Sequence, residues 1–102
     1  HCTDAERIFS YRALRIARGD TTPLPGFDEN AYAPMSGANL RTMDSILDEF
    51  ESVRDATVTL YQGLPSEAWT RRGEASGKTV SVRGIAWITA GHLLHHLSVI
   101  QD

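Results

Sequence analysis

The residues best suited to chemistry are the histidines near the end of the chain, in the stretch AGHLLHHLSVI. His92 and His96 are four residues apart, so on a helix their side chains project from one face, one turn apart. Ile85, Thr89 and Val99 fall on the same face, which predicts that it points toward the core. Two neutral imidazoles at this spacing can bind one metal ion, as the histidines of an H-E-x-x-H helix do.

The spacing of this histidine pair leaves two interpretations open. Core histidines are often simply hydrogen-bonded, and an unsatisfied buried imidazole costs about 1–3 kcal/mol. A shared metal ion would remove that cost for both rings. Leu93 stands where H-E-x-x-H has its glutamate, so the metalloprotease motif and its general base are absent. His95 lies about 100° around the helix from His96, which predicts a place at the rim of a site.

A third ligand would complete the protein side of a catalytic zinc site, which commonly has three protein ligands and one open position. The remaining histidine is His1, at the start of a predicted helix. Antiparallel or crossed packing would bring it to the histidine face of the last helix. Imidazole donors suit zinc, nickel, copper or iron, so the residue types leave the ion open. Nucleophilic catalysis has less support, because Cys2 points about 100° away from His1 on a helix.

Two long helices are predicted before the histidine helix. The first covers residues 3–18 and is capped by Thr3 or Asp4. Its Glu6 and Arg12 are interpreted as surface or capping residues, with pocket lining as the alternative.

The second of these helices covers residues 39–62. It is capped by Asn39, carries an apolar stripe from Leu40 to Leu64, and ends at Gly63 and Pro65. A short helical turn, PSEAW, and a loop or short hairpin, TRRGEASGKTV, follow it.

The long connection over residues 19–38 holds three prolines and three glycines, which exclude a regular helix through most of it. A connection of this length is often functional, and the alternative is a plain crossover between helices. Phe27 and Tyr32 are expected to hold it to the core. The last helix begins after Ser81, and apolar residues surround most of it, which predicts a central position.

Composition excludes several classes of protein. The chain has 102 residues, which predicts a single domain over residues 1–102, and its formal charge of -3 comes with no basic patch for nucleic acid. No apolar run is long enough to span a bilayer. One cysteine and the lack of a visible signal peptide predict a cytoplasmic protein.

Three segments together resemble the DinB-like (DinB/YfiT-like) superfamily: DAERIFSYRALRIARGD after His1, LPGFDENAYAP, and AGHLLHHLSVI. The resemblance covers nearly the whole chain and implies an all-α fold. The implied architecture is three long helices of a four-helix up-down bundle with a long crossover loop. The resemblance starts at the family's second helix, so we expect the first one to be missing.

The resemblance also implies a function. Family members hold a divalent ion, zinc or nickel among others, with one histidine from the second helix and an H-x-x-x-H pair from the last. Here these positions are His1, His92 and His96. Members of known activity include metal-dependent transferases of low-molecular-weight thiols and thiol-dependent isomerases, and others are classed as hydrolases. The implied partner is a small-molecule substrate such as a thiol. An acidic residue is expected at position 93, where this chain has Leu93.

A non-catalytic helical-bundle module that dimerises or binds a partner is the alternative from another class. Without the family's first helix, the remaining helices would leave an apolar groove of several hundred Å², roughly the size that soluble monomers rarely expose. A symmetric dimer is the commonest way to cover such a face. We therefore expect a homodimer through apolar residues of the first and last helices.

Overall fold

The computed structural model describes the backbone of residues 1–101 and the side chains of residues 1–98. The all-α class is confirmed, and a small hairpin is the exception to it. The elements are α1 (Cys2–Ala17), α2 (Glu29–Met35), the 3-10 turn η1 (Ala38–Leu40), α3 (Met43–Gln62), the 3-10 turn η2 (Ser66–Thr70), β1 (Arg72–Ala75), β2 (Lys78–Ser81) and α4 (Val82–Gln101). Val99 and Ile100, assigned from sequence to the apolar side of the last helix, lie outside the described side chains.

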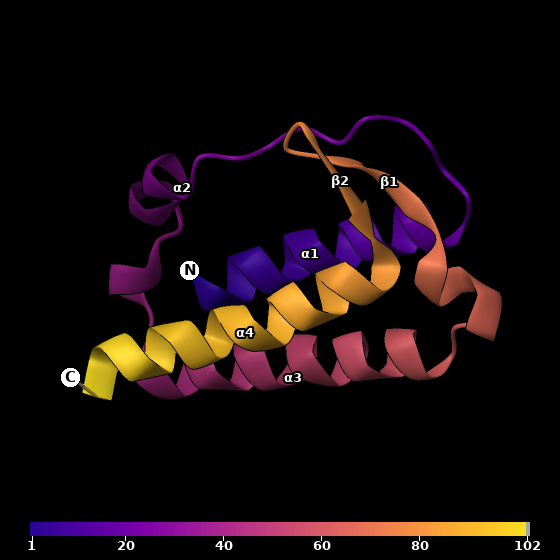
Figure 1. Cartoon of the computed structure of the whole chain (residues 1–102). Coiled ribbons are helices and arrows are strands. Elements are labelled where there is room, and N and C mark those ends of the chain that lie inside the picture. Colours follow the sequence, from indigo (N-terminus) through magenta and orange to yellow (C-terminus); the bar gives the residue numbers. More distant parts are fainter. Residues whose placement is uncertain (102) are drawn as a thin grey trace.

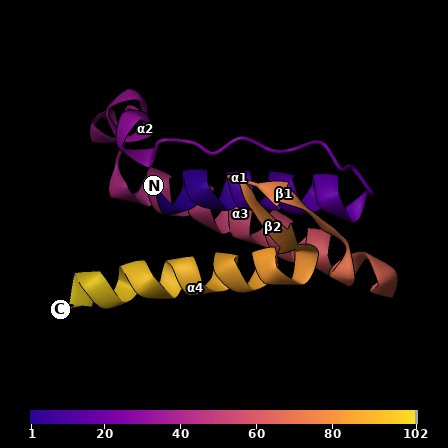
Figure 2. The same ribbon diagram turned by 45° about the horizontal axis from the view of Figure 1, so that its top comes forward.

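The three long helices lie side by side, with α1 and α3 running in one direction and α4 in the other (Figures 1 and 2). The segment between α1 and α3 passes over the outside of the bundle and returns the chain to the end where α1 starts (Figure 1). This crossover allows consecutive long helices to run parallel, as in bundles with long connections. The start of α1 and the end of α4 therefore lie at the same end of the bundle.

The helix in the middle is α1, so the expectation of a central last helix was wrong. α1 packs against both α3 and α4, which make few contacts with each other. Its buried alanines allow close approach of the neighbouring helices, and Ile16 fills the space between them. The main core cluster consists of Ala13, Ile16, Ala17, Ala68, Val82 and Ile85. Trp87, on the opposite side of α4 from this core, is 75% exposed.

Two of the helix starts differ from the sequence expectation. α1 begins at Cys2, and its N-cap is His1, whose carbonyl accepts a hydrogen bond from the Ala5 N–H at 2.9 Å. α3 begins at Met43 with Thr42 as its N-cap, not Asn39, because the Thr42 hydroxyl accepts the Ser45 N–H at 3.1 Å. Ser81 caps α4 as expected, accepting the Gly84 N–H at 2.9 Å.

The crossover is attached to the hairpin at Leu24, not through Tyr32 as expected. Leu24 is 4% exposed and pairs with Ala75, with its N–H donating to the Glu74 carbonyl at 2.9 Å. Tyr32 is exposed, and its ring lies 5.3 Å from that of Phe27, which is only partly buried. The crossover is also not irregular throughout, since α2 forms within it.

The hairpin predicted as one option for TRRGEASGKTV is present, with β1 and β2 antiparallel and Ala75 paired with Lys78. Its two turn residues, Ser76 and Gly77, both have positive φ (53° and 76°), as a type I′ turn requires. At Gly73 there is no room for a side chain, because a Cβ there would lie 2.8 Å from Ile16 Cγ1. The hairpin therefore packs directly on α1, under the crossover.

Glu6 and Arg12 are buried, which corrects their interpretation as surface or capping residues. Glu6 is 3% exposed and accepts hydrogen bonds from Arg54 on α3, at 2.6 Å to Nη2 and 3.0 Å to Nε. The Thr57 hydroxyl also donates to Glu6, at 2.9 Å. Arg12 donates to the Pro25 carbonyl at 3.0 Å and so holds the crossover to α1. Glu6 is thus paired with a positive charge on α3, and Arg12 is hydrogen-bonded to the crossover.

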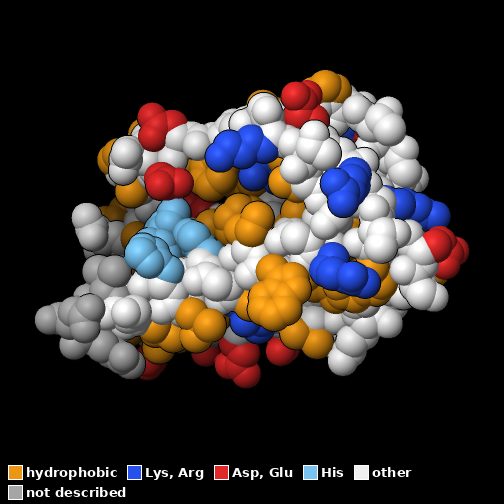
Figure 3. Space-filling model, viewed as in Figure 1, with side chains coloured by type: hydrophobic (Ala, Val, Ile, Leu, Met, Phe, Trp, Pro, Cys, Tyr) orange, Lys and Arg blue, Asp and Glu red, His pale blue; other side chains and the backbone are white. Residues whose placement is uncertain are grey.

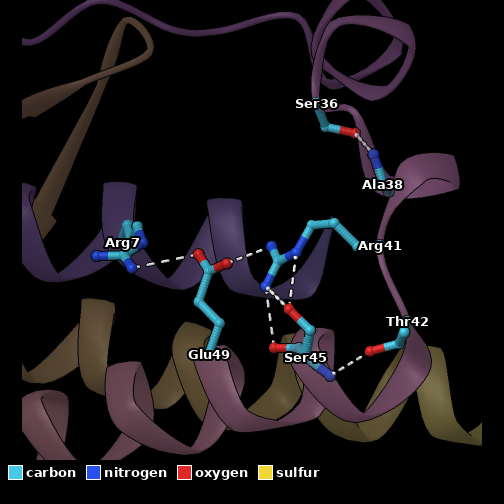
Figure 4. A network of polar contacts seen from close by, with 7 residues as sticks. All are labelled: Arg7, Ser36, Ala38, Arg41, Thr42, Ser45 and Glu49. Atoms are coloured by element: carbon cyan, nitrogen blue, oxygen red, sulfur yellow. Dashed lines mark hydrogen bonds and ion pairs between the residues drawn. The ribbon is translucent and has the colours of Figure 1, made fainter.

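A second polar network lies on the surface at the start of α3 (Figure 4). Glu49 accepts hydrogen bonds from Arg7 on α1 and from Arg41, which precedes α3. Arg41 also donates to the Ser45 carbonyl at 2.9 Å. These contacts hold the segment before α3 against the helices. None of the helices over the described residues has the length and hydropathy needed to cross a membrane.

Candidate metal centre

Three of the four histidines come together at the end of the bundle where α1 starts. The Nε2 atoms of His1 and His92 are 3.1 Å apart, and those of His92 and His96 are 3.2 Å apart. Each residue offers one ligand atom, and these atoms all lie within 4.8 Å of one another. The rings meet at steep angles of 65° to 76°, so they radiate around a common point.

Helix packing positions each of these rings. His92 and His96 lie one turn apart on α4, as the spacing predicts, and Ile85 and Thr89 on the same face are buried. Because α4 runs antiparallel to α1, the N-cap residue His1 meets them from the neighbouring helix. The Phe9 ring stands edge-on to His92, with 5.6 Å between ring centroids, and supports it from α1.

The three nitrogens cannot satisfy one another by hydrogen bonding alone. An imidazole nitrogen carries either one proton or one lone pair, so His92 Nε2 can serve only one of its two neighbours as donor or acceptor. Two nitrogens bound to a tetrahedral zinc ion at about 2.0–2.1 Å would be about 3.3–3.4 Å apart. The observed separations are close to that value, and one ion would use all three lone pairs. The group of His1, His92 and His96 could therefore hold a metal ion.

Electrostatics favour the neutral form of the middle ring. Burial lowers the pKa of His92 from its ordinary value, and the nearby charge of His96 acts in the same direction, while Glu29 opposes both. The neutral ring is the form that binds metal. His92 therefore presents its lone pair at a lower pH than an exposed histidine does.

A hollow of about 400 Å³ opens over the histidine group. His95 lines it from an exposed position beside His96, with 5.4 Å between the ring centroids, as expected for a rim residue. The crossover and the hairpin supply the other wall. The residues lining the hollow are His1, Ala5, Phe9, Phe27, Glu29, Ser76, His92, His95 and His96. On the surface, the histidines form one patch beside acidic side chains (Figure 3).

A second hollow of about 370 Å³ lies next to the first, under α2. His1, Phe27 and Glu29 line both hollows, so the two share a wall. The second hollow is bounded further by Asp4 and Tyr32, and the rest of its lining comes from α2 and the turn after it. Together they offer room for a small molecule beside the histidine group.

Sequence reasoning did not identify Phe27, Glu29 or Ser76 as residues near the site. The available signal was the length of the crossover, which suggested function without naming residues. Glu6 and Arg12, considered as possible pocket residues, line neither of these hollows.

The fold and the site together define a class: a helical bundle with a three-histidine group that could hold a divalent ion. The chain belongs to the DinB superfamily, whose family model matches residues 1–100. The match agrees with the resemblance of the three sequence segments. The comparison with curated proteins gives no match, and neither does the comparison with solved structures.

Proposed function

We propose that this protein is a metal-dependent enzyme acting on a small molecule, with zinc or nickel held by His1, His92 and His96. The observation that carries the proposal is the convergence of three Nε2 atoms, two pairs of them 3.1 and 3.2 Å apart, beneath an open hollow. Membership of the DinB superfamily supports it. The reaction proposed is transfer of a low-molecular-weight thiol, with hydrolysis as the alternative reaction.

A divalent ion held there would supply Lewis acidity, which lowers the pKa of a water or thiol and polarises an electrophile. The chain's own residues do the rest. His1, His92 and His96 would hold the ion, and the hollow over them would admit a ligand from solution. Phe9 packs edge-on against His92, and burial lowers the pKa of that ring, which favours its neutral form.

The substrate is proposed to lie across both hollows. The reacting atom would enter the hollow over the histidines, and the rest of the molecule would lie under α2. Phe27 and Tyr32 offer ring faces there, and Ser36 and Asn39 offer polar groups. This arrangement suits a small polar molecule with an apolar portion.

Loading with cobalt and titration with cysteine tests the proposal on protein without a polyhistidine tag. We expect one ion per chain and a thiolate charge-transfer band in the absorption spectrum as cysteine is added. Since a thiol loses its proton on binding metal, the apparent affinity should rise as the pH rises through neutrality. Failure to retain any ion after desalting would contradict the proposal. An ion without a thiolate band would favour hydrolysis over thiol transfer.

A second candidate function is an interaction module that forms a homodimer, and the exposed apolar side chains of α4 favour it. Trp87 and Leu94 are 75% and 66% exposed, and Tyr11 on α1 is exposed as well. Apolar side chains at the start of α3 are also uncovered, with Met43 67% and Leu47 56% exposed. Exposed apolar patches mark interaction surfaces, and Trp87 and Leu94, seven residues apart on α4, lie close to one line along that helix.

We predict a homodimer at micromolar concentration, measured by sedimentation equilibrium. Trp87→Glu should shift the chain toward monomer, because it places a charge in the proposed interface. Glu51→Gln on the exposed side of α3 is the control and should leave the association unchanged. A well-folded wild-type monomer would contradict the dimer and leave the metal site unaffected.

A further inference from the structure

Glu29 is the only carboxylate among the residues that line the histidine hollow in the part of the chain the structure describes. It lies in the first turn of α2, where the Asp28 side chain caps the helix by accepting the Asn30 N–H at 3.0 Å. Glu29 itself is exposed. Among the described residues, no basic side chain forms an ion pair with it. Its carboxylate is therefore available to a ligand in the hollow.

Glu29 lies apart from the three histidines that could hold the ion. It is not part of the group whose ligand atoms lie within 4.8 Å of one another. It stands on the crossover wall, and the histidines come from α1 and α4. A ligand in the hollow would thus have the histidine group on one side and this carboxylate on another.

We propose that Glu29 is the proton acceptor for the nucleophile that enters the hollow, an inference that rests on the proposed function. A Glu29 carboxylate oxygen would take the proton from the O–H of a water or the S–H of a thiol. The electron pair of the broken bond stays on the oxygen or sulfur, which attacks the electrophile. The protonated carboxyl then returns its proton to the leaving group, so that no other reactant is needed.

Glu29 would take the role of general base, for which the last helix has no carboxylate beside His92. In H-E-x-x-H helices the general base follows the first histidine, and Leu93 occupies that position here. The crossover supplies a carboxylate from a segment more than sixty residues away in the chain, at position 29 against 93. Asp4 is a weaker candidate because it lines only the neighbouring hollows. His95 is a weaker one because its ring lies beside the ligand His96, at the exposed rim.

The first test measures how strongly the bound ion takes up an anion, and it does not depend on catalytic activity. Cobalt-loaded wild type, Glu29→Gln and Asp4→Asn are titrated with azide, and the visible absorption spectrum reports binding. A carboxylate facing the same space repels the anion, so Glu29→Gln should bind azide about tenfold more tightly than wild type. Asp4→Asn should change the affinity less. Equal azide affinities for wild type and Glu29→Gln, with the ion bound in both, would overturn the assignment of Glu29 alone.

The second test measures proton transfer with p-nitrophenyl acetate as a model ester and the zinc-loaded protein. General-base catalysis contributes roughly 10²–10⁴-fold, so Glu29→Gln should lose about a hundredfold or more in kcat/KM while keeping its zinc. His95→Gln is measured as the rival base, and Glu51→Gln on the exposed side of α3 is the control that should retain the activity. Loss in His95→Gln with none in Glu29→Gln would assign the base to His95 and overturn the proposal. If wild type binds no ion in either test, the proposed function itself fails, and this inference fails with it.

Discussion

Replacing His92 by alanine is expected to abolish stoichiometric binding of zinc or nickel. His92 Nε2 is the atom that contacts both other ligands, at 3.1 Å from His1 and 3.2 Å from His96. Without His92, only the nitrogens of His1 and His96 remain to hold the ion. Even outer-shell partners of a metal are worth about 10–100-fold in affinity, so loss of this ligand should cost more than about a hundredfold.

The measurement is competition with a chromophoric chelator, together with metal analysis of the desalted protein. His96→Ala should behave like His92→Ala. His95→Ala is the matched control, since it removes an imidazole from the same helix turn and from the rim of the same hollow. Circular dichroism would show whether each variant keeps its helices. Unchanged zinc affinity in folded His92→Ala would rule out the three-histidine site.

Replacing Glu6 by alanine is expected to destabilise the fold by about 1.5–3 kcal/mol, the usual contribution of hydrogen bonds to a charged group, because the Arg54 side chain is 32% exposed and water can partly solvate its charge. Glu6 is 3% exposed and accepts hydrogen bonds from both Arg54 and Thr57. Its removal leaves the Arg54 guanidinium without its counter-charge between α1 and α3. The Thr57 hydroxyl would lose an acceptor in the same place.

Urea denaturation followed by circular dichroism measures this free energy of unfolding. Glu49→Gln is the matched control, because Glu49 also receives two arginines but lies at the surface, where ion pairs contribute about 0–1 kcal/mol. The double variant Glu6→Met with Arg54→Met should recover part of the loss, since it leaves no buried charge unpaired. A loss in Glu6→Ala no larger than in Glu49→Gln would show that the buried pair does not stabilise the fold.

Local sequence signals determined most of the secondary structure. Apolar residues recurring every three or four positions predicted the long helices, and Gly63 and Ser81 marked helix ends where the structure has them. These features depend on neighbours within about one helix turn, so spacing is enough to predict them. The same reasoning placed His92 and His96 on one face of α4. The start of α3 was wrong, because Asn39 was predicted as its cap and Thr42 takes that place.

Tertiary structure decided which of these elements meet. No local signal could place His1 3.1 Å from His92, because that distance depends on the antiparallel packing of α1 and α4. The burial of Glu6 depends on Arg54, which lies on another helix. The place of Glu29 on the wall of the histidine hollow depends on the path of the crossover, held at Leu24. The sequence alone thus determined the helices and the histidine pair. Long-range packing decided the rest, because residues far apart in the chain have no fixed spacing that encodes their contact.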